Sequence, residues 1–190
     1  MEKPLFELTM SSLPVHGNNM NTKTYEPMLL MDFTDPDTQT AWHPINDGVM
    51  GGQSRGEPQF VDHRLVFKGV ISLANNGGFA SVRARDQHHD LSAFDGVLLR
   101  VRGDGRSYQF RLYTDAHHQG SRIAYATTFQ TTRDAWLELR LHFSQLQPTL
   151  RGRRLSGPAF DPRHVQQMGF LLADKHEGAF ELCVDWIKAV

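Results

Sequence analysis

The 190-residue sequence has little cysteine, almost no net charge and no long hydrophobic run, and each absence excludes a class of protein. Its one cysteine, Cys183, excludes a disulfide within the chain and is typical of a reducing compartment. A formal net charge of −1 gives no electrostatic basis for binding DNA or an anionic membrane. Arg, Asp or Gly interrupts every apolar run, so no membrane span is predicted. Because no signal peptide or presequence is recognised, we expect a cytoplasmic protein.

Few residues point to catalysis. The sequence has neither a phosphate-binding glycine loop before a helix nor a His-Glu-x-x-His zinc motif. Cys183 lies between hydrophobic residues without a basic neighbour, which is typical of an inert buried thiol. The sequence therefore predicts a protein that is not an enzyme.

Short alternating runs of apolar and polar residues recur between turn residues, which is the pattern of an all-β sandwich. The predicted strands are Leu29–Phe33, Gln59–Phe67, Val70–Leu73, Phe79–Arg85, Gly96–Arg102, Tyr108–Thr114, Ile123–Phe129, Trp136–Phe143, Gln167–Ala173 and Phe180–Ile187. One short helix is predicted at residues 161–167, where Asp161 and Pro162 provide a helix start. No crossover helices separate the strands, so a parallel α/β fold is excluded.

The segment Gly103–Arg106 is predicted to be the loop of a β-hairpin. In that register one face is apolar and carries Val97, Leu99, Val101, Tyr108, Phe110 and Leu112. The opposite face carries Arg100, Arg102, Gln109 and Arg111. A slip by one residue would bury the arginines, so the register is strongly specified. By the same alternation the closing strand turns one set of residues toward the core, namely Phe180, Leu182, Val184 and Trp186.

Two Gly-Gly pairs lie in polar surroundings inside this β pattern. Glycine is favoured where the backbone needs a positive φ or a close approach, and neighbouring Asn and Asp tolerate the same geometry. Because the strands between the two segments run out and back, we expect the segments to lie side by side. They would present one candidate binding site for a ligand or partner, made of Trp42, Asn46, Asp47, Ser54, Asn75, Asn76 and Arg83. The alternative is that these side chains only hold the turns together.

The same two segments carry a family resemblance. The run NDGVMGGQS (residues 46–54) and the run FKGVISLANNGGFASVR (residues 67–83) resemble the complex I intermediate-associated protein family, and the likeness extends from about Leu29 to the C-terminus. The resemblance implies a jelly-roll β-sandwich similar to galactose-binding domains, without catalytic activity. It also implies a protein partner in a respiratory or other oxidoreductase complex, since founding members help to assemble NADH:ubiquinone oxidoreductase. The alternative is a module that binds a carbohydrate or small ligand, which the fold permits.

The outward arginines are a second candidate site. Arg100, Arg102 and Arg111, together with Arg83, could form one concave face, and the planar guanidinium group binds two oxygens of a carboxylate or phosphate. The alternative is a solvated sheet face on which carboxylates of neighbouring strands balance the arginines.

No cofactor or metal is predicted. The pairs His88-His89 and His117-His118 lie in polar segments without an organised partner. Asp32, Asp35 and Asp185 are candidate calcium ligands, and the alternative is that they are ordinary surface aspartates.

The chain is predicted to divide into two regions. Residues 1–27 contain prolines and polar runs without alternation, and we expect a poorly ordered extension there. Residues 28–190 form the β-sandwich domain.

Overall fold

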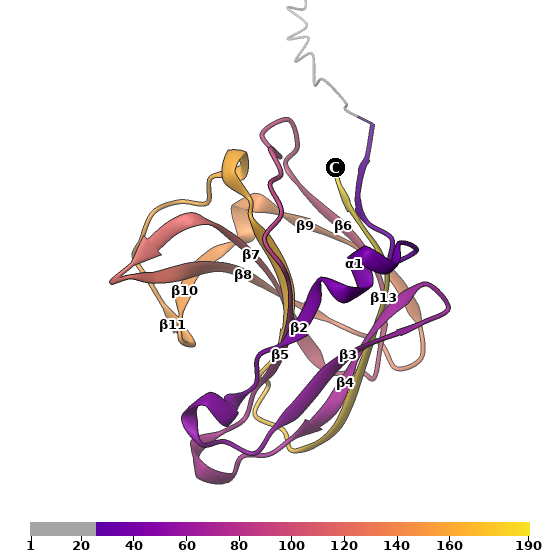
Figure 1. The fold of residues 1–190 in the computed structure, drawn as a ribbon, viewed down its shortest axis with the longest axis vertical. Coiled ribbons are helices and arrows are strands. Elements are labelled where there is room, and N and C mark those ends of the chain that lie inside the picture. Colours follow the sequence, from indigo (N-terminus) through magenta and orange to yellow (C-terminus); the bar gives the residue numbers. More distant parts are fainter. Residues whose placement is uncertain (1–25) are drawn as a thin grey trace, which may run out of the picture.

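The computed structural model describes residues 26–190, which form two antiparallel sheets packed face to face (Figure 1). Of the predicted extension, only Glu26 and Pro27 fall within the described residues. The strands are β1 (Met28–Met31), β2 (Trp42–Pro44), β3 (Arg55–Val61), β4 (Arg64–Ile71), β5 (Ala80–Ala84), β6 (Gly96–Gly103), β7 (Ser107–His118), β8 (Ser121–Gln130), β9 (Trp136–His142), β10 (Gln147–Leu150), β11 (Arg153–Arg154), β12 (Gln167–Leu172) and β13 (Gly178–Ala189). The helical segments are α1 (Pro36–Thr40), η1 (Asp47–Met50), η2 (Ala74–Asn76), η3 (Phe143–Gln145) and η4 (Pro162–His164).

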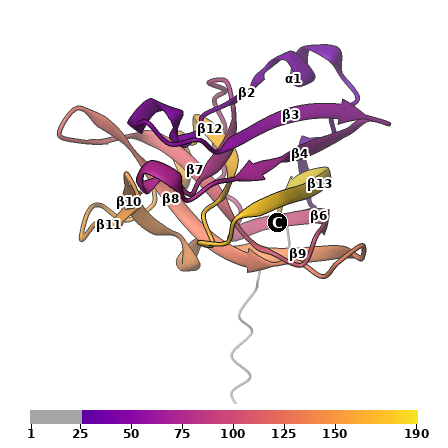
Figure 2. The same cartoon turned by 90° about the horizontal axis from the view of Figure 1, so that it is seen from below.

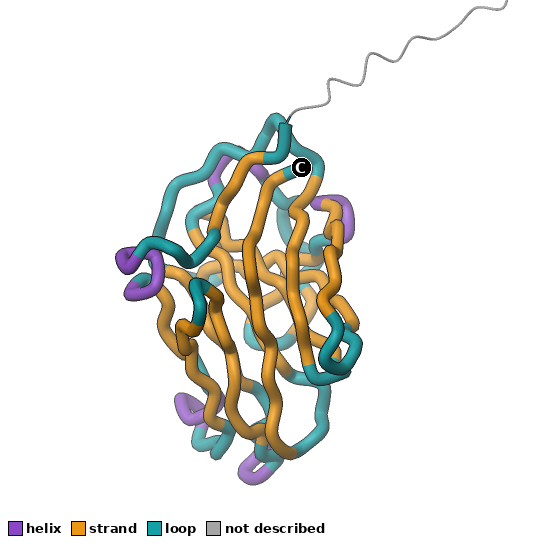
Figure 3. Tube along the Cα trace, turned by 90° about the vertical axis from the view of Figure 1, so that its right-hand side faces the viewer, coloured by secondary structure: helices purple, strands orange, loops and turns teal. Residues whose placement is uncertain are grey.

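The six-stranded sheet has the order β3-β4-β13-β6-β9, and β1 pairs with the end of β13. The seven-stranded sheet has the order β11-β10-β8-β7-β12-β5-β2. Figure 2 shows the two sheets as separate layers, and Figure 3 shows the first described strand beside the C-terminal strand. The predicted all-β jelly-roll sandwich is confirmed.

The core between the sheets follows the predicted alternation. On β6, for example, Val97, Leu99 and Val101 are at most 1% exposed. One position differs: a β-bulge after Val184 shifts the register of β13, so Trp186 turns to the outer face and Ile187 is buried instead. A bulge adds one residue to a strand and thereby reverses the alternation beyond it.

The predicted hairpin around Gly103–Arg106 is wrong. Strand β6 pairs with β9 and β13, whereas β7 pairs with β8 and β12 in the other sheet. The short connection crosses from one sheet to the other, and the apolar residues assigned to one hairpin face meet across the core. Alternation of apolar residues fixes which side chains face the core, but it does not specify the neighbouring strand.

Two further boundaries differ from the prediction. The predicted strand Gln59–Phe67 is interrupted by a tight turn at Asp62 and His63, both with positive φ (49° and 58°), which joins β3 to β4. The Asp-Pro start at residue 161 yields only the 3-10 turn η4, whereas the α-helix α1 follows the same signal at Asp35 and Pro36. None of the helices within residues 26–190 has the length and apolarity to cross a membrane.

Candidate functional site

Two glycine-containing turns meet at one end of the sandwich. The first (residues 46–54) contains η1 and the second (residues 72–79) contains η2; we call them together the two-turn tip (Figure 1, lower left). The side-chain amide of Asn75 donates to the carbonyl of Gly51 (3.1 Å), and the backbone N–H of Asp47 donates to the carbonyl of Phe79 (3.4 Å). The prediction that the two segments lie side by side is confirmed.

Asp47 joins the two turns from inside. Its side chain is 0% exposed and accepts three backbone N–H groups, from Ser54 on Oδ1 (2.9 Å) and from Gly78 and Phe79 on Oδ2 (2.7 and 3.2 Å). Burial acts to raise the pKa of this carboxyl, but the hydrogen bonds from Ser54, Gly78 and Phe79 outweigh it and hold the pKa below its ordinary value. Asp47 is therefore a structural residue and has no free oxygen to offer a ligand.

The glycines of the tip make room for this carboxylate. A Cβ on Gly52 would lie 2.3 Å from Cγ of Asp47, and a Cβ on Gly77 would lie 2.6 Å from its Oδ2. Asn75 and Asn76 adopt the left-handed conformation (φ 55° and 56°) that their short polar side chains tolerate. The unusual composition of the two segments thus follows from wrapping two backbone turns around one buried charge.

Ser54 is also an internal contact. Its hydroxyl donates to the carbonyl of Ser72 (3.1 Å) and accepts the N–H of the same residue (3.0 Å). The spacing Gly52–Ser54–Gly56 matches the Gly-x-Ser-x-Gly pattern of hydrolase nucleophiles, which the sequence prediction overlooked. Here Ser54 is 5% exposed, precedes strand β3 instead of a helix, and hydrogen-bonds no histidine within the described residues. The serine is therefore not an activated nucleophile.

Trp42 and Asn46 are directed inward as well. The indole of Trp42, which was predicted to belong to the binding site, is 5% exposed and lies 6.1 Å from the ring of Phe170 in a stacked arrangement, so it is part of the core. The side-chain amide of Asn46 donates to the carbonyl of Gly56 (3.0 Å) and holds the first turn to β3. Most of the polar residues predicted as one site therefore build the tip, and Arg83 lies farther along β5.

The tip presents apolar side chains to solvent. Val49 is 78% exposed, Met50 is 63% exposed and Leu73 is 42% exposed. All three come from the two turns that Asp47 holds together. Exposed apolar residues are common singly, but several on one fixed surface are typical of an interaction site.

The predicted arginine face is divided between the two sheets. Arg100 and Arg102 lie on the outer face of the six-stranded sheet, over the ring of Trp136 (5.4 and 5.3 Å from the ring centroid). Arg83 and Arg111 lie on the outer face of the seven-stranded sheet. The prediction of a single face is wrong because β6 and β7 are not neighbours.

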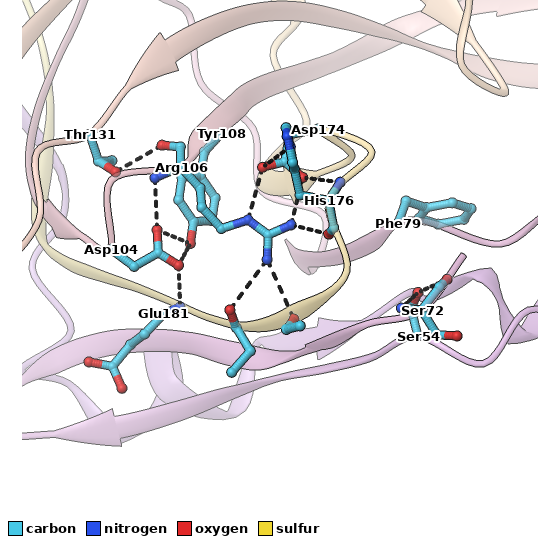
Figure 4. Close-up of polar contacts among 12 residues, drawn as sticks. Ser54, Ser72, Phe79, Asp104, Arg106, Tyr108, Thr131, Asp174, His176 and Glu181 are labelled. Atoms are coloured by element: carbon cyan, nitrogen blue, oxygen red, sulfur yellow. Dashed lines mark hydrogen bonds and ion pairs between the residues drawn. The ribbon is translucent and has the colours of Figure 1, made fainter. Parts of the chain in front are cut away.

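A polar network that the sequence did not predict stabilises the connection between β6 and β7, which crosses from one sheet to the other (Figure 4). The guanidinium group of Arg106 donates from Nη2 to Oδ1 (2.6 Å) and from Nε to Oδ2 (2.9 Å) of Asp174, and it also reaches the carbonyl of His176. The hydroxyl of Tyr108 donates to the carboxylate of Asp104, and burial together with that charge raises the pKa of this phenol. The only sequence signal was the charged, glycine-rich composition of residues 103–106.

Metal ligands do not gather in the part of the chain that the structure describes. No group of three His, Cys, Asp or Glu side chains there could hold an ion. The three aspartates proposed for calcium are used separately: Asp32 accepts from Thr34, Asp35 caps α1, and Asp185 pairs with arginines. Cys183 is 3% exposed, and burial raises the pKa of its thiol.

Comparison with known proteins identifies the family. The family model for complex I intermediate-associated protein 30 (CIA30) matches residues 31–184. The chain belongs to this family. It is 31% identical over 144 residues to the mitochondrial complex I intermediate-associated protein 30 of Mus musculus, and 23% identical over 184 residues to that of Drosophila melanogaster. The matches cover 73% and 85% of the chain but only 42% and 62% of the length of these relatives. Both relatives are named mitochondrial, which contradicts the predicted cytoplasmic location.

Solved structures share the fold. The family 11 carbohydrate-binding module of a Clostridium thermocellum cellulase superposes with a TM-score of 0.68 at 14% identity, over 88% of this chain and 95% of the module. An agarase, AgWH50C, superposes with a TM-score of 0.54 at 12% identity, over 86% of this chain and 24% of that enzyme. At these identities the likeness establishes the sandwich architecture and no more.

Proposed function

We propose that this member of the CIA30 family is a non-enzymatic protein-binding module that assists assembly of a respiratory oxidoreductase, and that it docks through the two-turn tip. The family relationship supports the assembly role, since the relatives are named for intermediates of complex I. The observation that carries the docking surface is the pair Val49 and Met50, exposed to 78% and 63% on a turn that is fixed from within.

The rigidity of the tip supports recognition of a protein. Three hydrogen bonds from backbone N–H groups to the buried carboxylate of Asp47 leave the turns little freedom to lose on binding. A preorganised surface binds more tightly because less conformational entropy is lost on association. Met50 adds a flexible, polarisable side chain, which adapts to the shape of a partner surface.

The catalytic and carbohydrate-binding alternatives have less support. Ser54 is bound on both sides by the backbone of Ser72, and Trp42 offers no ring to a sugar. For carbohydrate binding there remains only the fold likeness to carbohydrate-binding modules, and fold does not determine ligand.

The test is co-migration of the tagged protein with complex I assembly intermediates on native gels, in cells of the organism that encodes it. The wild-type protein is expected to co-migrate, and the double variant Val49→Asp, Met50→Asp is expected to lose this association while it remains folded. Val61→Asp is the matched control, because Val61 is 52% exposed at the turn between β3 and β4. If the wild-type protein never co-migrates, the assembly role is wrong; if the double variant still co-migrates, the tip is not the docking surface.

A further inference from the structure

The outer face of the seven-stranded sheet contains buried residues that do not belong to the core. Tyr113, Ala124, Ala126 and Leu171 are 4–7% exposed, yet they alternate with core residues and lie outside the core cluster. Small side chains on this face lie deep between the longer side chains of neighbouring strands. The face is therefore partly apolar and partly buried, and it differs from an ordinary solvated sheet surface.

Two arginines lie on this face, on either side of strand β12. Arg83 on β5 and Arg111 on β7 are both opposite Gly169 of the intervening strand β12, so their Cα atoms lie roughly 10 Å apart. Because Gly169 has no side chain, the side chain of Arg83 can extend across β12 and reach Tyr113 on β7. The guanidinium carbon of Arg83 lies 4.0 Å from the centroid of the Tyr113 ring, and its Nη2 donates to the Tyr113 hydroxyl (2.9 Å).

Arg111 lies on β7, as Tyr113 does, and its guanidinium group is held by Gln109 of the same strand. Its Nε and Nη2 donate to Oε1 of Gln109 at 3.1 and 2.8 Å. Two oriented guanidinium groups thus lie on one face of the sheet, that of Arg83 over the ring of Tyr113 and that of Arg111 beside the side-chain amide of Gln109. Each group retains N–H donors that no residue within 26–190 accepts.

Neither arginine has a carboxylate partner within the described residues. Asp86 is near enough to Arg83 for a Coulombic interaction, but its carboxylate is bound by Arg122 (2.9 and 3.3 Å). On the six-stranded sheet the situation is different, because Arg64 and Arg100 share the carboxylate of Asp185 at 2.9 and 3.3 Å. Like charges side by side on a sheet are unfavourable unless an anion lies between them.

We infer that Arg83 and Arg111 form an oxyanion-binding site on the outer face of the seven-stranded sheet, for a ligand that bears a carboxylate or a phosphate. The planar forks bind two oxygens each, and both ions have the geometry to accept them. Tyr113 orients one fork and Gln109 orients the other, so the donors are preorganised. The site lies on a sheet face, whereas Val49 and Met50 lie on a turn at one end of the sandwich, and it does not depend on the proposed docking function.

The experiment follows the arginine Nε–Hε signals of the full-length protein by NMR during titration with citrate and, separately, with inorganic phosphate, at constant ionic strength. The signals of Arg83 and Arg111 are expected to shift in a saturable way with at least one anion, and the signal of Arg102 is expected to remain unchanged. A response to citrate alone assigns a carboxylate, and a response to phosphate alone assigns a phosphate. No saturable shift with either anion, or an equal shift at Arg102, overturns the site.

Variants test the two residues separately. Arg83→Gln and Arg111→Gln are each expected to weaken binding by about tenfold or more, because each removes charge-assisted hydrogen bonds. Arg102→Gln is the matched control, since Arg102 also lies over an aromatic ring on an outer sheet face and has no ion pair with any residue in the range 26–190. Arg111→Lys retains the charge but not the planar fork, and it is expected to weaken binding as well. Unchanged affinity in both glutamine variants contradicts the inference.

Discussion

Replacement of Asp47 by Ala is expected to remove much of the stability of the domain. The substitution leaves the N–H groups of Ser54, Gly78 and Phe79 without their acceptor in a buried position. Hydrogen bonds to a charged acceptor are worth roughly 1.5–3 kcal/mol each, and the loss of the buried carboxylate's desolvation cost offsets part of the three. We therefore expect the free energy of unfolding to fall by roughly 3–5 kcal/mol, which is above the range of most single substitutions.

The assay is urea unfolding of the wild type and of Asp47→Ala, with extrapolation to water and comparison of the m-values. Asp90→Ala is the control, because Asp90 accepts one N–H, from Ser92, in an exposed turn. A loss of less than about 1 kcal/mol in Asp47→Ala, or a loss equal to that of the control, would refute the structural role of this carboxylate.

The dependence of stability on pH provides a second test of the hydrogen bonds to Asp47. The pKa of Asp47 is lower in the folded than in the unfolded protein. Its contribution to the free energy of unfolding is therefore fully present above the unfolded pKa of about 3.9, and it is lost as the pH falls through the folded pKa. The difference in stability between the wild type and Asp47→Ala should therefore be constant near neutral pH and shrink in acid below about pH 4. A difference that grows in acid would contradict the sign of the shift.

Three further predictions concern neighbouring contacts. Gly52→Ala should lower the free energy of unfolding by roughly 1–3 kcal/mol, because its Cβ would overlap the Asp47 side chain, whereas Gly48→Ala meets no atom within 4 Å and should have little effect in the same urea assay. Arg106→Met should cost roughly 2–4 kcal/mol in thermal or urea unfolding, since it removes the arginine partner of the largely buried carboxylate of Asp174; stability unchanged from the wild type would show that the crossover does not depend on the ion pair. Cys183 should react with a thiol reagent at neutral pH only as fast as the protein opens, because burial raises the pKa of its thiol, and reaction at the rate of a free thiol would contradict its burial.

The sequence predicted which residues face the core better than it predicted which strands are neighbours. Val97, Leu99 and Val101 were assigned to the core from alternation alone, and they are buried. The pairing of β6 with β7 was wrong because alternation is satisfied equally by two strands in one sheet and by two strands that face each other across the core. The long-range pair Arg106 and Asp174, which accompanies the observed crossover, is also not revealed by local sequence.

The position of the two turns was predicted more accurately than the direction of their side chains. The glycine pairs and asparagines indicated two tight turns, and the return of the intervening strands indicated that the turns meet. Which polar groups face inward depends on burial, so Asp47 and Ser54 could not be assigned as internal contacts from sequence. The apolar residues Val49 and Met50, which lie between them, were not predicted to be exposed, although they are 78% and 63% exposed.

The docking role of the two-turn tip is tested most directly by site-specific photo-crosslinking in cells that are assembling complex I. A photo-reactive amino acid replaces Val49 in one sample and Val61 in the other, since both positions are exposed and lie on different turns. The proposed function predicts crosslinks from position 49 to subunits or assembly factors of complex I, and none from position 61. Crosslinks from position 61 alone, or none from position 49 to any such protein, would contradict it.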